Sequence, residues 1–187
     1  MTETGTQNPR ERYRTQVRAE IKERAWEQIA SAGASALSLN AIAKQMGMSG
    51  PALYRYFAGR DELITELIRD AYRSLADTFR AAGEAGADLA GLAHALRGWA
   101  LEDPQRYFLI YGTPVPGYHA PEDTVGIASE IMATLLDACD ARDDVALRFW
   151  TRLHGVLSLE LAGHFTGMDF DPASLFSEEA EGLLTHP

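Results

Sequence analysis

The 187-residue chain carries 17 Lys and Arg against 27 Asp and Glu, and its formal net charge is −10. A uniformly basic nucleic-acid-binding protein is therefore excluded, because neutralising phosphates needs an excess of Lys and Arg. The charge is unevenly distributed, however. Residues 1–60 hold 9 basic and 5 acidic residues, net +4, whereas residues 61–187 hold 8 and 22, net −14. Such an asymmetry between segments indicates two functions in one chain.

The cysteine content and the hydropathy pattern restrict the class of protein further. Cys139 is the only cysteine, which excludes an internal disulfide and a zinc site built from several cysteines. The stretch from Thr2 to Arg18 is polar and charged, without the apolar core of a signal peptide. No uncharged apolar run is long enough to span a bilayer. We therefore expect a cytoplasmic protein without a membrane segment.

The N-terminal part begins with a polar segment and continues as a helix. Residues 1–12 offer no side chains for a core, so we predict a disordered arm. From Tyr13 onward, apolar residues recur every four positions, which is typical of an amphipathic helix. Gly33 would end this helix as a C′ glycine. The apolar stripe consists of Val17, Ile21, Ala25 and Ile29.

Two short helices follow, joined by a glycine-containing turn. Ser38 is a good N-cap for the first of them, and Gly47 would end it. Ser49 would begin the second, with Pro51 near its first turn, where the missing N–H costs nothing. This pattern predicts a helix-turn-helix. The residues expected to form its shared core are Leu39, Ile42, Leu53 and Phe57.

Beyond Gly59 the pattern predicts only helices. A long amphipathic helix runs from Leu63 to Phe79 and fades at Gly83 and Gly86. The proline-rich stretch 112–121 predicts a loop. Because no alternating strand pattern occurs, we predict an all-α protein. The further helices are expected at about 88–101, 104–111, 122–139, 144–165 and 173–184.

The segment from Ile21 to Leu67, which contains LSLNAIAKQMGMSGPALYRYFAGRDELI, resembles the N-terminal domain of TetR-type transcriptional regulators. Its most specific part is Tyr54-x-Tyr56-Phe57-x-x-Arg60-x-x-Leu63. Tyr56 stands where the family often has His, and Arg60 where it often has Lys; both substitutes can donate to a phosphate oxygen. The match covers about the first third of the chain. It implies a helix-turn-helix DNA-binding domain at 13–60, after the disordered arm at 1–12.

The resemblance also implies DNA-contacting roles. The phosphate-contacting residues would be Ser38, Tyr54, Tyr56 and Arg60. Base edges would face Ser49, Gly50, Pro51, Ala52 and Arg55, of which only Arg55 can make a bidentate contact to guanine. Lys44 and the arm residues would add backbone or minor-groove contacts. The arm residues are Arg10, Arg12, Arg14 and Arg18.

Alternatives remain for several of these residues. Tyr56 could pack in the core beside Phe57. Arg60 could pair with a neighbouring acid as a surface residue at a helix start. The cluster from Arg10 to Arg18 could be part of a solvated arm without any DNA contact.

For residues 61–187 the resemblance implies a helical ligand-sensing and dimerisation domain. In addition, Trp150-x-x-x-His154-Gly155 resembles the Trp-His-Gly signature of one subclass of TetR-type C-terminal domains. A ligand pocket would take its aromatic and polar lining from Trp99, Tyr107, Phe108, Tyr111, Trp150 and His154. A dimer interface on helices 144–165 and 173–184 would use small residues, namely Gly155, Ser158, Ala162 and Gly163. For both sets, ordinary core packing is the alternative.

The sequence predicts neither catalysis nor a cofactor. His154 and His164 lie ten positions apart, and with His94 and His119 they give no metal-ligand spacing. Ser158 lacks the surroundings of a nucleophile elbow. We expect a homodimeric repressor that binds a double-stranded DNA operator with an inverted repeat and is released by an unknown small-molecule effector. The alternative is a helical small-molecule-binding or protein-interaction module without specific DNA binding, because Gly50 and Ala52 offer few base contacts.

Overall fold

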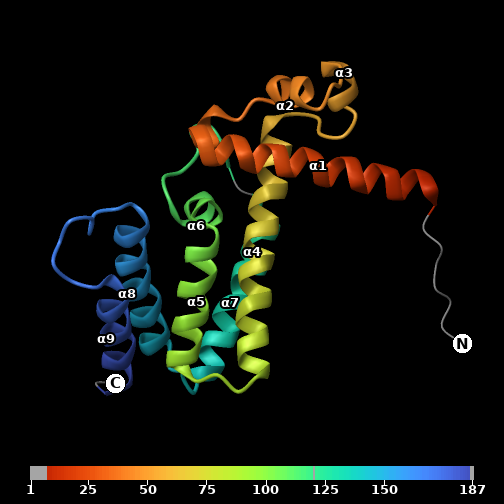
Figure 1. Cartoon of the computed structure of the whole chain (residues 1–187). Coiled ribbons are helices and arrows are strands. Elements are labelled where there is room, and N and C mark those ends of the chain that lie inside the picture. The colour runs from red at the N-terminus through yellow and green to blue at the C-terminus, as the bar shows by residue number, and fades with distance from the viewer. Residues whose placement is uncertain (1–7, 120, 186–187) are drawn as a thin grey trace, which may run out of the picture. The chain divides into compact units, whose positions relative to one another are not determined.

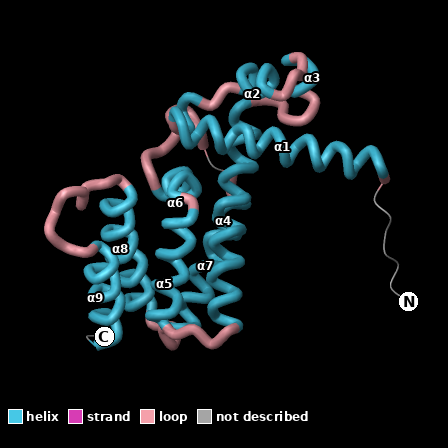
Figure 2. Tube along the Cα trace, in the orientation of Figure 1, coloured by secondary structure: helices cyan, strands magenta, loops and turns pink. Residues whose placement is uncertain are grey.

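The computed structural model describes residues 8–119 and 121–185, with side chains to residue 182. Within these residues it contains nine α-helices, one short 3₁₀ helix and no strand (Figures 1 and 2), which confirms the all-α prediction. The helices form two compact units. The N-terminal unit comprises the chain to Leu67 together with Pro114–His119, and the C-terminal unit comprises Ile68–Thr113 and the chain after residue 119. The boundary between the two packed units thus lies within one helix, after Leu67. The boundary expected at residue 60, between the DNA-binding domain and the ligand-sensing domain, stays a prediction.

Helix α1 (Pro9–Ala32) is the longest element that lies wholly in the N-terminal unit. All four residues of its predicted apolar stripe are buried. The helix begins earlier than expected, because the Asn8 side chain accepts a hydrogen bond from the Arg10 N–H at 3.1 Å and a proline occupies the first turn. Residues 9–12 are therefore helical instead of part of a disordered arm. The rest of that predicted arm, residues 1–7, lies outside the described residues.

The N-terminal unit contains further helical elements. They are the 3₁₀ helix Ala34–Ala36, α2 (Leu39–Gln45), α3 (Gly50–Leu53) and the first two turns of α4 (Arg60–Glu84). The predicted core residues Leu39, Ile42, Leu53 and Phe57 are each at most 5% exposed. The segment 114–119 joins them through Val115, which is buried, and through Tyr118, whose hydroxyl is hydrogen-bonded to Thr65 Oγ1 of α4 at 3.0 Å.

The C-terminal unit contains the rest of α4 and five further helices. Their bounds agree with the predicted ranges except at one end. The predicted helix 144–165 stops at Leu161, since Gly163 adopts a φ of +76° and the N–H of His164 turns back to the Leu159 carbonyl at 3.0 Å. The five helices are α5 (Leu89–Glu102), α6 (Pro104–Tyr111), α7 (Asp123–Ala138), α8 (Asp143–Leu161) and α9 (Pro172–Thr185).

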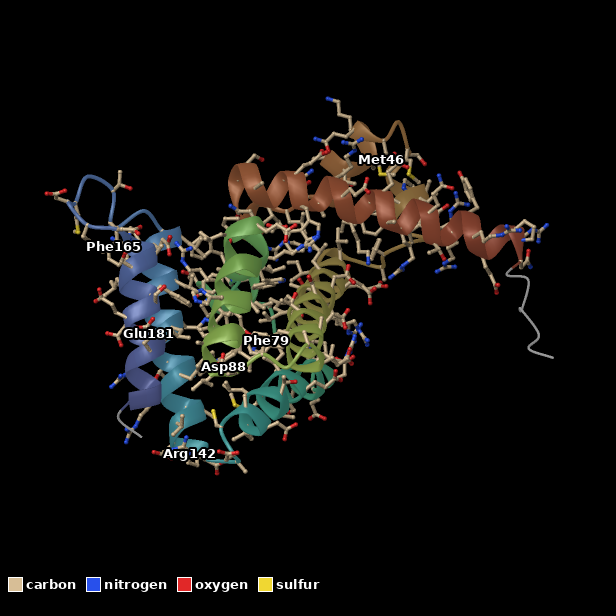
Figure 3. The ribbon with its side chains drawn as sticks, turned by 60° about the horizontal axis from the view of Figure 1, so that its bottom comes forward. Met46, Phe79, Asp88, Arg142, Phe165 and Glu181 are labelled. Carbon is tan, nitrogen blue, oxygen red and sulfur yellow. The ribbon has the colours of Figure 1, made fainter. Side chains whose placement is uncertain are left out.

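The core of the C-terminal unit is aromatic and aliphatic. Figure 3 shows Phe79 of α4, which is fully buried, among the side chains of neighbouring helices. Helices α8 and α9 lie side by side (Figure 1). One ion pair is inserted at the edge of this core: Arg97 of α5 donates to Glu160 of α8 at 2.6 Å, with both side chains largely buried. No helix of the described residues is long and apolar enough to cross a bilayer.

Candidate DNA-binding and ligand sites

The turn between α2 and α3 has the geometry of a helix-turn-helix. Gly47 adopts a φ of +64°, which lets the N–H of Met48 donate back to the Ala43 carbonyl at 2.8 Å. Ala43 is buried, so its small side chain allows α2 to pack closely against its neighbours. The chain can therefore turn within the four residues 46–49 and begin α3 at Gly50.

Helix α3 is short, but its hydrogen-bonded path continues beyond its last residue. The regular helix covers Gly50–Leu53, and the N–H groups of Tyr56 and Phe57 then both donate to the Leu53 carbonyl, at 2.8 and 3.3 Å. Leu53 and Phe57 are fully buried. The burial of these two residues leaves Tyr54 and Arg55 exposed between them.

Several of the predicted DNA-contacting side chains are exposed and have free donors, among them Lys44, Tyr54 and Arg55. Within the part of the chain that the structure describes, Lys44, Tyr54 and Arg55 make no side-chain hydrogen bond or ion pair. Tyr54 is 46% exposed. Among the remaining predicted contacts, Ser49 and Pro51 are exposed, and Gly50, Ala52 and Tyr56 are half-buried. The DNA contacts themselves stay predictions.

Ser38 is the N-cap of α2, as predicted. Its Oγ accepts a hydrogen bond from the Ala41 N–H at 3.3 Å, and its own N–H donates to Gln28 Oε1 at 3.0 Å. The backbone N–H therefore already has a partner within the protein. A phosphate contact by Ser38 would have to come from its hydroxyl hydrogen.

Arg60 is engaged within the N-terminal unit. Its guanidinium donates to the carbonyls of Ala34 and Ser35 at 3.1 and 3.2 Å, and it lies 3.7 Å from Asp61 Oδ1. The alternative of a pair with a neighbouring acid is thus present in the structure. These contacts hold the 3₁₀ helix Ala34–Ala36 to the start of α4, so a phosphate contact by Arg60 would compete with them.

Arg18 is also engaged, and in more ways. Its guanidinium lies 4.1 Å from the centre of the Phe57 ring and donates to the Tyr56 carbonyl. It also pairs with Glu66 at 3.4 Å and with Glu62 at 3.7 Å, both on α4. Arg18 therefore fixes the segment after α3 against α1 and α4. The DNA-contacting role predicted for it is not the role that this geometry favours.

An aromatic cluster lies in the C-terminal unit and contains five of the six predicted pocket residues. The His154 ring of α8 lies 4.3 Å from that of Trp150 and 4.4 Å from that of Tyr111 of α6, measured between centroids. Tyr107 stacks on His154, and Phe108 packs against Tyr107. We call these five residues, together with Tyr72, the aromatic cluster.

Two aromatic side chains differ from the predicted pocket lining: Trp99 lies outside the aromatic cluster, and Tyr72 belongs to it. Trp99 is buried and donates its indole N–H to Ser74 Oγ at 3.1 Å, which fits the core alternative. Tyr72 of α4 was not predicted, yet its ring meets Tyr111 edge to face at 6.1 Å. The apolar periodicity of α4 places Tyr72 on the buried stripe, but nothing in that periodicity indicates which helix it faces.

Burial controls the ionisation of the aromatic cluster. It raises the pKa of Tyr107 to about 12, and the pKa of Tyr72 and of Tyr111 is also raised, mainly by burial. It lowers the pKa of His154 to about 4, so the imidazole is neutral at neutral pH. His154 Nδ1 lies 3.0 Å from the Tyr107 hydroxyl oxygen, whereas its Nε2 is buried without a hydrogen-bond partner among the described residues.

A groove of about 600 Å³ runs along α8 and the beginning of α9. Gly155, a predicted interface residue, is exposed and lines it, and Leu159 beside it is 44% exposed. Ser158 is half-buried, and its hydroxyl donates to the Gly155 carbonyl at 3.1 Å. Ala162 and Gly163 are exposed but lie past the last residue of α8, in the turn that ends it. The helical face of small residues is therefore shorter than predicted.

Comparisons with known proteins cover both units. Residues 21–67 match the family of bacterial regulatory proteins named tetR, and residues 89–183 match the tetracyclin repressor-like C-terminal domain. The HTH-type transcriptional regulator Rv1816 of Mycobacterium tuberculosis is 36% identical to this chain. The alignment is 229 positions long, gaps included, and covers 98% of this chain and 97% of the relative.

Solved structures show the same fold. The crystal structure of the regulatory protein SCO4313 is 68% identical, with a TM-score of 0.91 over 95% of this chain and 99% of that one. A protein of unknown function from Rhodococcus sp. RHA1 shares the fold at 22% identity, with a TM-score of 0.72 over 97% of each chain. The two families whose sequences match this chain consist of transcriptional regulators and not of enzymes. The chain therefore belongs to the tetR family of bacterial regulatory proteins and is a DNA-binding transcriptional regulator with a helix-turn-helix.

Proposed function

We propose that the protein is a homodimeric repressor that binds an inverted-repeat operator through α2 and α3, and that a small molecule bound in the C-terminal unit releases it. One observation carries the DNA-binding part. The side chains of Lys44, Tyr54 and Arg55 keep their donors free beside a fully packed helix-turn-helix core, while Arg18 and Arg60 are engaged internally. Free donors on a rigid support are what a phosphate backbone and base edges require.

The chemistry of these residues divides the work of recognition. The Arg55 guanidinium can donate twice to O6 and N7 of one guanine. Tyr54 and Lys44 can each donate to phosphates, which sets the register without reading sequence. Gly50 and Ala52 have little to offer to base edges. Sequence preference should therefore rest on Arg55 and on the deformability of the operator.

Dimerisation through α8 and α9 would place two such surfaces together. The groove along α8 contains an exposed leucine beside an exposed glycine, and Leu147 on the same helix is 61% exposed. Exposed apolar side chains next to a small residue favour a close helix contact with a second copy. Because the first 60 residues carry a net charge of only +4, one copy alone would bind DNA weakly.

The aromatic cluster supports the ligand-binding part of the proposal. Small-molecule sites are mostly apolar and aromatic, with a few polar groups that fix orientation. The rings of α6 and α8 provide the first property, and the hydroxyls and the neutral imidazole provide the second. Effectors typically change DNA affinity by about 1–3 kcal/mol of coupling free energy.

The deciding experiment is a binding titration by fluorescence anisotropy with DNA from upstream of the protein's own gene that contains an inverted repeat. We expect tighter binding to this DNA than to a scrambled duplex of equal length, with affinity falling as salt is raised. Equal affinity for both duplexes would contradict operator recognition and favour a helical binding module without specific DNA binding.

A further inference from the structure

Among the described residues, the aromatic cluster contains one buried polar atom without a hydrogen-bond partner. Nε2 of His154 is buried and has no partner within the described residues, although the other ring nitrogen, Nδ1, lies 3.0 Å from the Tyr107 hydroxyl oxygen. A buried polar group without a partner destabilises the folded protein, because it has lost its hydrogen bonds to water. Such groups are rare in proteins, and each calls for a specific explanation.

The hydrogen bonds of Tyr107 determine which kind of group Nε2 is. The Tyr107 hydroxyl oxygen lies 3.0 Å from His154 Nδ1 and also 3.3 Å from the His154 carbonyl oxygen. A hydroxyl has a single hydrogen, so both contacts are hydrogen bonds only if the hydroxyl donates to the carbonyl and Nδ1–H donates to the hydroxyl oxygen. In that tautomer of the neutral ring, Nε2 carries a lone pair and is an acceptor.

The surroundings of this nitrogen suit an apolar molecule. The rings of Tyr111 and Trp150 lie 4.4 and 4.3 Å from the imidazole. Both rings, like His154 itself, are half-buried, while Nε2 is itself covered. Because burial keeps the imidazole uncharged at neutral pH, the site offers no positive charge to an anion.

We propose that His154 Nε2 accepts a hydrogen bond from a hydroxyl or N–H group of a small aromatic effector that contacts Tyr111 and Trp150. This inference rests on the proposed function, since it names the chemistry of the effector that the C-terminal unit binds. It separates ligands by one property: a donor on an apolar ring is recognised, whereas an acceptor at the same place faces the lone pair and is rejected.

Three matched probes test the inference on the full-length protein: phenol, which can donate, anisole, which can only accept, and toluene, which can do neither. Binding is followed by NMR of protein labelled with ¹⁵N in its histidines, and the His154 signals are those missing from His154→Phe. In the free protein we expect Nε2 to have the shift of an unprotonated ring nitrogen. Phenol should move that shift and bind about tenfold more tightly than anisole or toluene.

Two variants serve as controls. His154→Phe keeps an aromatic ring but lacks the nitrogen, so phenol should lose its advantage over toluene. His164→Phe alters an exposed histidine in the turn after α8 and should leave the preference for phenol unchanged. A protonated Nε2 in the free protein, tighter binding of anisole than of phenol, equal binding of all three probes, or no binding of phenol would each overturn the inference.

The inference can fail independently of the proposed function. Probe binding is measured without DNA, so a preference for phenol that depends on His154 would stand even if the protein bound no operator. Conversely, specific operator binding together with equal affinities for the three probes would refute the role of His154 and leave operator recognition standing.

Discussion

Trp150 and His154 lie four residues apart on α8, which places both side chains on one face of the helix. Their ring centroids are 4.3 Å apart, and both contact Tyr111. Gly155, the next residue, points elsewhere and lines the groove along α8. The Trp-His-Gly pattern thus has a structural account here: its aromatic pair belongs to the aromatic cluster, and its glycine lines the groove along α8.

The buried imidazole predicts a specific loss of stability in acid. Folding lowers the pKa of His154 from 6.5 to about 4, so between these values the unfolded chain binds a proton that the folded chain does not. This stabilisation is present above pH 6.5 and falls as the pH drops toward 4, by up to about 3 kcal/mol. In urea titrations at a series of pH values, wild type should lose this increment and His154→Phe should not. Parallel pH profiles for the two proteins would contradict the burial of a neutral histidine.

A glycine in the turn of the helix-turn-helix and a glycine in α5 should respond in opposite ways to substitution by alanine. Gly47→Ala forces a side chain into the left-handed region at φ +64° and should lower the free energy of unfolding by about 1 kcal/mol. Gly98→Ala, at an exposed helical position with open space around it, should raise that free energy by about 1 kcal/mol. Thermal unfolding of both variants measures the contrast, and stabilisation by Gly47→Ala would refute the turn geometry.

Two exposed side chains near α3 should act differently on DNA. Arg55→Ala should reduce the discrimination between operator and scrambled DNA by about 1–3 kcal/mol, because it removes the bidentate donor. Tyr54→Phe should weaken binding to both DNAs equally, because it removes a phosphate donor. Anisotropy titrations with the two duplexes separate these effects. Unchanged discrimination in Arg55→Ala would remove Arg55 from the readout.

Sequence reasoning succeeded for these residues to different degrees. Short-range patterns identified the cap at Ser38 and the turn at Gly47. They could not place Arg18 and Arg60, because the partners of a long side chain depend on which helices meet. Glu66 lies 48 positions from Arg18 in the sequence, and their contact exists only once α1 packs against α4.

Among the elements, the beginning of α1 is unusual because its first two turns are exposed throughout in the part of the chain that the structure describes. Residues 9–16 are all exposed, and Tyr13 is 64% exposed. Three arginines and one glutamate occupy these turns. A solvated helical end gains no stability from core packing, so its composition is free to serve the attraction to phosphates.

This end of α1 predicts a change in salt dependence. The double variant Arg10→Ala and Arg14→Ala should lower the slope of log affinity against log salt by about 2, since each phosphate contact contributes about 0.9. Arg24→Ala is the matched control, because Arg24 is exposed on the same helix but pairs with Glu27 at 2.6 Å. The slopes come from anisotropy titrations at several salt concentrations. An equal slope in wild type and the double variant would mean that the beginning of α1 does not contact DNA.

Helix periodicity predicted most element bounds, and its failures have physical causes. Phe165 continues the apolar spacing of α8, yet the chain leaves the helix before it because Gly163 adopts a left-handed conformation. The start of α1 was placed too late because the Asn8–Pro9 start signal precedes any apolar residue. Local capping residues determined the end of α8 and the start of α1, whereas the apolar pattern determined the middle of each helix.

From the charge distribution along the chain and the exposed groove along α8, we expect tight DNA binding to require dimerisation. Leu159→Glu places a charge in the groove along α8 and should shift sedimentation toward the monomer and weaken operator binding at least tenfold. Leu101→Glu, at a leucine of α5 that is 40% exposed, is the matched control and should do neither. If the Leu159→Glu protein remained dimeric, the dimer interface would have to lie outside this groove.

The hydrogen bond between Thr65 and Tyr118 has a consequence for the modularity of the chain. The N-terminal unit is not a continuous stretch of sequence, because it includes Pro114–His119. A chimera that joins a foreign DNA-binding domain to this chain at Leu67 would keep Val115 and Tyr118 but remove the surface on which they pack. Recombination between relatives therefore has to exchange two segments together. A working chimera would therefore take residues 114–119 from the same parent as the helix-turn-helix.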